Sequence, residues 1–295
     1  MGNLRTALLA WLFARTQQGQ FVLRVEDIDH PRVRPGATQQ MLTDLRWLGL
    51  DWDEGPDCGG PYAPYTQSER ISIYTCYLEK LQAADMVYPC YCSRVEVAQV
   101  ASAPQQGDEY SPRYAGTCRN LTEAQRQHYE ACGRRPSLRF RVDDDRLVTF
   151  TDLEMGPVTQ HVQRSVGDFI VRRSDGIFSY QFAVVVDDAL MHIHQIVRGN
   201  DLLTSTARQI LLYEALNFPV PMFAHVPLLV DEQGKRLSKR TQSMGLDPLR
   251  EQGATPEQIV GQLAASCRLV AKGTQISAKE LAHLYQDKVI PLQSE

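Results

Sequence analysis

The alternation of amphipathic helices with short apolar segments constrains the fold of this chain most strongly. Apolar residues within 4–12 share one helical face, the apolar run 21–25 follows, and a second amphipathic segment covers 41–48. Residues 178–186 are almost all large and apolar, which predicts a strand buried on both faces, and residues 225–230 predict another strand. This order predicts a parallel α/β sheet that binds ligands at the carboxyl ends of its strands.

The middle of the chain differs in character from these two stretches. A polar loop at 104–112 precedes residues 138–142, where apolar side chains alternate with Arg139 and Arg141 as in a half-exposed strand. We therefore expect an insert within the sheet domain. The expected parts are the first half of the sheet domain, the insert, the second half and a helical C-terminal region, at residues 1–87, 88–176, 177–245 and 246–295.

Composition and charge exclude several classes of protein. A hydrophobic fraction of 43% and a charged fraction of 22% are typical of a globular protein and exclude disorder. The net charge of −4 excludes a polycation that binds nucleic acid by charge alone, and no apolar run approaches the roughly 18 residues of a membrane helix. Seven cysteines in 295 residues are too few for a disulfide scaffold, so we expect reduced thiols and a cytoplasmic protein.

A basic loop is the sharpest local signal. Residues 234–240, G-K-R-L-S-K-R, place four cations within six positions beside a glycine and a serine. Such a loop suits a polyphosphate ligand, because its cations and amides match phosphate oxygens. The alternative is a solvated basic turn without a ligand.

Acidic residues follow the apolar segments. Glu26, Asp27 and Asp29 come at the end of the first predicted strand, and Asp187 and Asp188 come after the later one. Carboxylates at strand ends point into the crevice where open α/β sheets bind ligands, so these residues could hold an amine, a metal or ribose hydroxyls. The alternative is that they cap the turns that follow.

A group of cysteines forms the third signal. Cys90 and Cys92 form a C-x-C pair that could share a zinc ion with Cys118. The candidates for the remaining ligands are Tyr114, His128 and Cys132. We favour a metal site over three unrelated buried thiols, whereas Cys58, Cys76 and Cys267 are expected to be structural.

Six segments in order together resemble one known family. They read G-N-L-R-T-A-L, L-R-V-E-D-I-D, L-G-L-D-W-D, Y-Q-F-A-V-V-V-D-D, I-V-R-G and R-L-S-K-R, at residues 2–8, 23–29, 48–53, 180–188, 196–199 and 236–240. This set resembles the glutamyl branch of class I aminoacyl-tRNA synthetases, and the last segment resembles the Lys-Met-Ser-Lys-Ser loop. The resemblance implies a Rossmann-like catalytic domain, an inserted zinc-containing subdomain of the acceptor-binding type and a short helical C-terminal region.

Length discriminates within that branch. Fifty-five residues follow Arg240, too few for the large anticodon-binding region of a discriminating glutamyl-tRNA synthetase. The chain therefore resembles the short glutamyl-queuosine tRNA(Asp) synthetases. That resemblance implies an enzyme that activates L-glutamate with ATP, without tRNA, and transfers it to the queuosine base at the wobble position of tRNA(Asp). We expect a monomer.

The resemblance also implies roles for individual residues. Glu26 would hold the amino group of glutamate, Tyr180 would donate a hydrogen bond to the substrate, and Arg198 would receive the side-chain carboxylate. Lys239 would act in catalysis by stabilising the charge that develops on ATP, with magnesium on the leaving pyrophosphate. The implied ATP-binding residues are Arg236, Ser238 and Lys239. The implied ligands of one zinc ion are Cys90, Cys92, Tyr114 and Cys118.

The sequence departs from the family pattern at two places. Residues 1–3 coincide with the end of the family's His-Ile-Gly-His-like signature, so we expect a true start upstream of Met1, and Arg236 stands at the first position of the basic loop. Two other hypotheses remain: a discriminating synthetase cut short at its C-terminus, and a non-catalytic, zinc-stabilised RNA-binding remnant. The presence of Arg198 and of the loop 236–240 favours an enzyme over the remnant.

Overall fold

The strands in the described part of the protein form two separate sheets. The computed structural model describes residues 2–29, 33–100, 113–227, 246–286 and 290. In this part of the chain, an antiparallel sheet has the order β1–β2–β5, and a mixed sheet has the order β4–β3–β7–β6. In the mixed sheet β3 pairs antiparallel with β4, whereas β7 pairs parallel with both β3 and β6. The strands are β1 (Val87–Cys90), β2 (Ser137–Phe140), β3 (Leu147–Asp152), β4 (Gly156–His161), β5 (Phe169–Arg172), β6 (Gln195–Gly199) and β7 (Met222–Val226).

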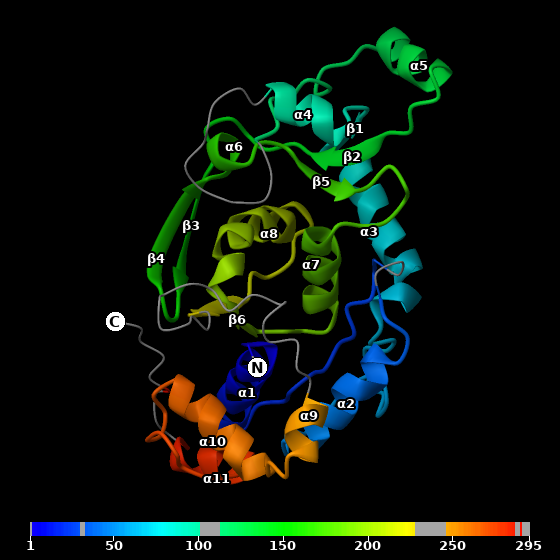
Figure 1. The fold of residues 1–295 in the computed structure, drawn as a ribbon. Coiled ribbons are helices and arrows are strands. Elements are labelled where there is room, and N and C mark those ends of the chain that lie inside the picture. Colours follow the sequence, from blue (N-terminus) through cyan, green and yellow to red (C-terminus); the bar gives the residue numbers. More distant parts are fainter. Residues whose placement is uncertain (1, 30–32, 101–112, 228–245, 287–289, 291–295) are drawn as a thin grey trace.

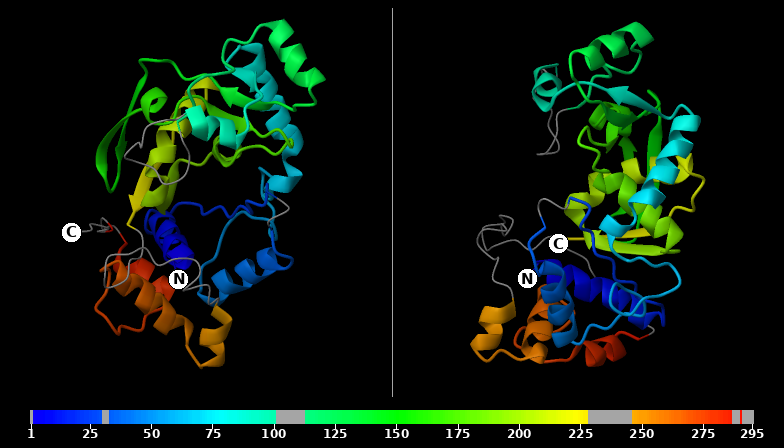
Figure 2. Two further views of the ribbon diagram at one scale, coloured as in Figure 1. Left: turned by 45° about the horizontal axis from the view of Figure 1, so that its top comes forward. Right: turned by 90° about the vertical axis from the view of Figure 1, so that its right-hand side faces the viewer.

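Helices connect and flank these sheets. They are α1 (Gly2–Thr16), α2 (Ala37–Trp47), α3 (Ile71–Ala83), α4 (Arg94–Val100), α5 (Glu123–Ala131), α6 (Val162–Ser165), α7 (Tyr180–Leu190), α8 (Leu203–Ala215), α9 (Leu246–Glu251), α10 (Pro256–Ser266) and α11 (Ala278–Leu284). The antiparallel sheet with α4 and α5 lies at one end of the molecule, and α1 with α9–α11 lies at the other (Figure 1). The two further views show the same order, with α7 and α8 between the ends (Figure 2). None of the described helices is long and apolar enough to span a bilayer.

Helix α7 corrects one expectation from the sequence. Residues 178–186 were expected to form a buried strand, but Tyr180 begins a helix whose amino end is capped by the Ser179 hydroxyl, which accepts from the Phe182 amide. Residues 182–188 are all buried, so every face of the helix carries apolar side chains. A short run that is apolar on all sides has no period that separates helix from strand. Asp187 and Asp188 therefore lie in the last turns of a helix and not at a strand end.

The predicted parallel sheet is also only partly correct. The pairing of β7 with β3 and β6 is parallel, but β4 adds an antiparallel edge to the same sheet. Residues 21–25 form no strand, because they make only isolated bridges, Val22 with Glu54 and Val25 with Thr66. The strand predicted at 225–230 begins earlier, as β7, and its residues 228–230 lie outside the described part.

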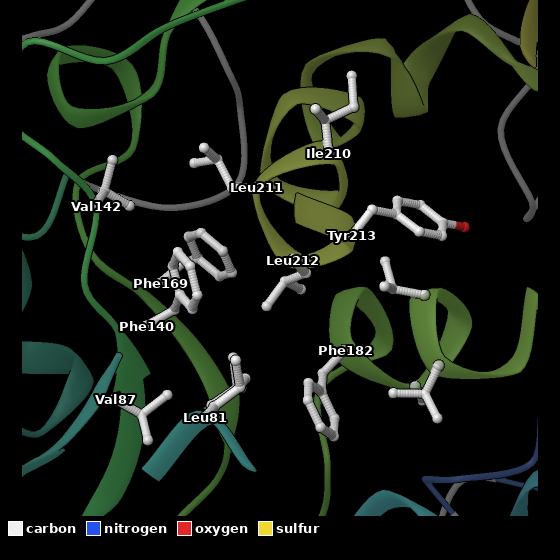
Figure 3. Close-up of a cluster of buried hydrophobic side chains, with 14 of the residues drawn as sticks. Leu81, Val87, Phe140, Val142, Phe169, Phe182, Ile210, Leu211, Leu212 and Tyr213 are labelled. Carbon is white, nitrogen blue, oxygen red and sulfur yellow. The ribbon is translucent and has the colours of Figure 1, made fainter. Parts of the chain in front are cut away.

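Two large clusters of buried side chains form most of the core in the described part of the chain, and a third, smaller one surrounds Cys90 and Cys118. The first joins the antiparallel sheet to α3, α7 and α8, and Figure 3 shows Phe140 and Phe169 beside Leu211 and Leu212 of α8. The rings of Phe140 and Phe169 stack at a centroid distance of 5.2 Å. The second cluster joins α1 to α10 and α11, with Leu45 and Leu48 from the α2 region. The antiparallel sheet of the expected insert thus shares one core with α7 and α8.

Candidate functional sites

Helix α7 ends in a network of buried charges. Asp187 has no exposed surface and accepts hydrogen bonds from Arg70 Nε at 2.6 Å, Tyr74 Oη at 2.8 Å and Gln67 Nε2 at 2.9 Å. These donors come from the segment that leads into α3 and from α3 itself. Because they satisfy both carboxylate oxygens, Asp187 joins α7 to α3 and is not free to bind a ligand.

Arg24 links this network to the predicted binding residue Glu26. Its guanidinium donates to Asp188 Oδ1 at 2.7 Å and to Glu26 Oε1 at 2.9 Å. The Glu26 side chain is 37% exposed, whereas that of Asp188 is 10% exposed. Glu26 is therefore the carboxylate of this group that a ligand can reach, and Arg24 holds it in place.

The structure brings the three predicted glutamate-binding residues together. Tyr180 opens α7 and is 36% exposed, and Arg198 lies in β6 with 7% exposed. Burial and the charge of Glu26 raise the pKa of Tyr180 to about 12, while the charge of Arg198 opposes this shift, so both charges lie close to the phenol. A carboxylate, a phenol and a guanidinium suit a ligand that carries both an amine and an acid.

Sequence reasoning missed the two residues behind Arg198. Arg198 Nε donates to His225 Nε2 at 2.9 Å, and His225 Nδ1 lies 2.5 Å from Asp152 Oδ2. Burial disfavours the Asp152 carboxylate, yet the hydrogen bonds from His225 and from backbone amides hold its pKa below the usual value. The one signal in the sequence was a histidine inside an otherwise apolar strand, β7, whose partner is 73 residues away.

The other acidic candidates of the first segment contact the protein itself. Asp27 accepts from the Ser68 amide at 2.8 Å and from the Ser68 hydroxyl at 2.7 Å, and Asp29 lies 3.5 Å from Arg173. Asp27 therefore holds the segment that leads into α3. This agrees with the alternative hypothesis that the acid serves the local structure and does not bind a ligand. The basic loop 234–240, with Arg236, Ser238 and Lys239, lies outside the described residues, so the ATP site stays a prediction.

The cysteine cluster is compact. The sulfur atoms of Cys90, Cys92 and Cys118 all lie within 4.8 Å of one another, and those of Cys92 and Cys118 are 3.5 Å apart. Tyr114 Oη lies 3.3 Å from Cys90 Sγ and 4.0 Å from Cys92 Sγ, and it accepts a hydrogen bond from the Cys118 amide at 2.8 Å. Among the described residues, this is the group whose donors could hold a metal ion.

The alternative ligands His128 and Cys132 do not join this group. They lie at the end of α5, where Cys132 is exposed and its sulfur is 3.9 Å from His128 Nε2. The neighbour that does join the cluster is Arg139, which donates from Nε to Cys90 Sγ at 3.2 Å and lies 3.8 Å from the ring centroid of Tyr114. A hydrogen bond from Cys118 and, against burial, the charge of Arg139 lower the pKa of Cys90 to about 4. The cluster therefore favours a thiolate.

Comparison with known families covers nearly the whole chain. The family described as "tRNA synthetases class I (E and Q), catalytic domain" matches residues 1–286. Two relatives named Glutamyl-Q tRNA(Asp) synthetase match 99% of this chain: that of Symbiobacterium thermophilum is 51% identical and covered over 90% of its length, and that of Nitratidesulfovibrio vulgaris is 45% identical and covered over 89%.

Longer proteins also match. A Glutamate--tRNA ligase of Symbiobacterium thermophilum is 45% identical over 88% of this chain, which spans 54% of that protein. The crystal structure of a Glutamate-tRNA Synthetase from Elizabethkingia anophelis superimposes with a TM-score of 0.81 and 32% identity, over 95% of this chain and 62% of that one. The chain is thus matched nearly end to end by the first two relatives and spans little more than half of these longer proteins.

Proposed function

The chain belongs to the class I tRNA synthetases of the glutamate and glutamine group and is a ligase, and from that premise we propose that it activates L-glutamate with ATP in the absence of tRNA. We further propose that it transfers the glutamyl group to the queuosine base at the wobble position of tRNA(Asp). The observation that supports the first step is that Glu26 and Arg198 both lie close enough to Tyr180 for their charges to act on its phenol, while Glu26 and Tyr180 are accessible to solvent. The second step rests on the relatives whose name includes tRNA(Asp) and which this chain matches over 99% of its length.

Binding of glutamate follows from the charges of Glu26 and Arg198 and from the neutral phenol of Tyr180. Glu26, held by Arg24, receives the ammonium group, and Arg198 pairs with the side-chain carboxylate. Tyr180, whose pKa of about 12 keeps its proton near neutral pH, donates a hydrogen bond to the substrate. The α-carboxylate is then the acid group left free to react.

Activation forms a mixed anhydride without a protein nucleophile. An oxygen of the α-carboxylate bonds to the α-phosphorus of ATP, and the bond from that phosphorus to the bridging oxygen of pyrophosphate breaks. Lys239 neutralises the developing negative charge, and Arg236 and Ser238 bind phosphate oxygens, as the resemblance of the loop implies. Magnesium, when bound with ATP, neutralises charge on the pyrophosphate that leaves.

We also propose one structural zinc ion on Cys90, Cys92, Cys118 and Tyr114. Tetrahedral zinc with bonds of about 2.3 Å to sulfur places its sulfur ligands about 3.8 Å apart, and the observed 3.5 Å between Cys92 and Cys118 fits this spacing. Three thiolates around a divalent cation leave one negative charge, which Arg139 balances. This ion would join the C-x-C pair to the loop at 114–118 and hold the expected insert together.

The test is exchange of labelled pyrophosphate into ATP with glutamate and without tRNA. We expect exchange with glutamate and not with glutamine, followed by transfer to tRNA(Asp) that carries queuosine and not to the same tRNA with guanine at that position. Transfer to tRNA(Glu) instead would favour the glutamate--tRNA ligase activity of the longer relatives. No exchange from a folded chain, including a version extended upstream of Met1, would overturn the proposal.

A substitution in the basic loop tests the catalytic assignment. Lys239→Ala should reduce exchange by about two to three orders of magnitude, the usual effect of removing a group that stabilises charge in the transition state. Lys235→Ala, in the same loop, is the matched control and should retain most of the activity. Equal loss in both variants would show a general effect of positive charge and would contradict the role of Lys239.

A further inference from the structure

We propose that Asp152 and His225 are positioning residues, which hold the Arg198 guanidinium in the orientation that receives the side-chain carboxylate of glutamate. This inference rests on the proposed function of Arg198. Asp152 ends β3, His225 lies in β7 and Arg198 lies in β6, so three strands of the mixed sheet present these side chains to one another. Asp152 is 1% exposed and His225 has no exposed surface.

The carboxylate of Asp152 has one defined orientation. Its Oδ1 accepts from the backbone amides of Glu154 at 3.0 Å, Met155 at 2.9 Å and His225 at 3.1 Å. Its Oδ2 faces His225 Nδ1 at 2.5 Å. Because an ionised carboxylate only accepts hydrogen bonds, Nδ1 of His225 carries the proton.

The proton on Nδ1 determines what His225 offers to Arg198. In the neutral ring Nε2 is then an acceptor, and it receives the Nε–H of Arg198 at 2.9 Å. The Thr206 hydroxyl, on α8, lies 3.1 Å from the same Nε2 and accepts from Arg198 Nη2 at 2.7 Å. Two hydrogen bonds to different nitrogens fix the plane of the guanidinium.

This arrangement leaves part of the guanidinium fork for a ligand. His225 occupies Nε and Thr206 occupies one hydrogen of Nη2, which leaves Nη1 and the second hydrogen of Nη2 to a ligand. An arginine ordered before binding loses less side-chain entropy when a carboxylate arrives. The Asp152 charge, relayed through His225, also offsets the cost of burying a cation that is 7% exposed.

Asp152→Asn is the most informative variant. The three backbone amides require an acceptor at Oδ1, so the amide nitrogen must take the place of Oδ2 and donate to His225 Nδ1. His225 then carries its proton on Nε2 and points it at the Nε–H of Arg198. We expect the KM for glutamate in pyrophosphate exchange to rise about 10- to 100-fold, the effect of losing a hydrogen bond to a charged group, with the KM for ATP unchanged.

Two variants at His225 separate positioning from packing. His225→Gln keeps an acceptor near the place of Nε2, whereas His225→Asn keeps a donor to Asp152 but offers no acceptor to Arg198. We expect the glutamine variant to rescue the KM for glutamate relative to the asparagine variant by about tenfold. A residue that only fills space would give two variants with the same KM.

Asp168→Asn is the matched control. Asp168 is equally buried, at 1% exposed, and accepts from the Val142 amide at 2.8 Å and from Tyr88 Oη at 2.5 Å. It lies next to β5 of the antiparallel sheet, whereas Arg198 lies in β6 of the mixed sheet. We expect this variant to lose stability in thermal unfolding without a change in the KM for glutamate.

The ring nitrogen shifts of His225 provide a readout that does not depend on activity. Nitrogen-15 NMR should show the Nδ1–H form in the wild type and the Nε2–H form in Asp152→Asn, with the signal assigned by its loss in His225→Gln. The Nε2–H form of His225 in the wild type would overturn the inference. A change of tautomer in Asp152→Asn that leaves the KM for glutamate unchanged would also overturn it. Absence of exchange in the wild type would instead overturn the proposed function.

Discussion

The cysteine cluster and the Arg198 site both contain buried polar side chains, but the two regions differ in where the partners of these side chains come from. The cluster takes all its donors from residues 90–118 and faces three sulfurs toward one another with a single cation, Arg139, beside them. The Arg198 site takes its members from distant segments: Arg24 pairs with Glu26 and Asp188, and His225 links Arg198 to Asp152. The zinc ion that we propose would balance the compact set of donors, whereas the dispersed set has its partners within the protein.

The largest effect is expected from removing a sulfur of the cluster. Cys118→Ala should abolish binding of zinc, with an affinity loss of at least about a hundredfold, since even an outer partner of a ligand contributes that much. Elemental analysis should find about one zinc per chain in the wild type and none in the variant. Cys76→Ala, an exposed cysteine of α3, should keep its zinc. A folded wild type that contains no zinc would contradict the proposed metal site, and the cysteine cluster would then be complete without an added ion, like the Arg198 site.

The next effect concerns the dispersed network. Asp187→Asn leaves the buried Arg70 without its full counter-charge and should lower the free energy of unfolding in urea by about 3–5 kcal/mol. Asp85→Asn is the control, because Asp85 is 87% exposed and lies 3.7 Å from Arg141, so its loss should cost under about 1 kcal/mol. Equal costs would show that burial does not distinguish these ion pairs.

A smaller effect is expected where the dispersed site meets its ligand. Glu26→Gln removes the negative charge proposed to hold the ammonium group, so the KM for glutamate should rise about 10- to 100-fold. Asp27→Asn, one residue further, should leave this KM unchanged because Asp27 contacts Ser68. If Asp27→Asn raised the KM as much as Glu26→Gln, the assignment of Glu26 would be wrong.

The smallest effect is a dependence of the free energy of unfolding on pH, caused by Glu154, which lies close to Asp152. Burial, with the charge of Asp152, raises the pKa of Glu154 to about 7, from 4.5 in the unfolded chain. The folded state therefore binds the proton more tightly, and the resulting stability is present below pH 4.5 and lost as the pH rises through 7.

Urea unfolding of the wild type and Glu154→Gln measures this dependence. The stability of the wild type relative to the variant should fall by about 1 kcal/mol between about pH 5 and about pH 8, a value reduced for solvent screening. Glu251→Gln, an exposed change of the same kind, should show no such trend. A relative stability that rises with pH would reverse the sign and contradict the raised pKa.

The sequence predicted the local features better than the distant ones. The C-x-C pair indicated its own cluster, and the 3.6-residue period located α1, α2, α10 and α11, because each signal lies within a few turns of chain. The run 178–186 was taken for a strand because a segment buried on all sides has no polar face to show its period. The contact between Asp152 and His225 was not predicted, since it depends on which strands become neighbours in the sheet.

The amide hydrogens of helix α7 are expected to be among the slowest in the protein to exchange with solvent. Its residues 182–188 are buried on every side, and Asp187 ties its last turn to α3. We expect these amides to exchange only when the buried cluster that joins the antiparallel sheet to α3, α7 and α8 unfolds as a whole. Their exchange would then report the global unfolding equilibrium. Residues 21–25 make isolated bridges and hydrogen bonds to the segments at 53–54 and 65–67, outside any regular sheet, so we expect their amides to exchange earlier, through local openings. We therefore expect the segment that carries Glu26 to open more often than the helix that carries Tyr180.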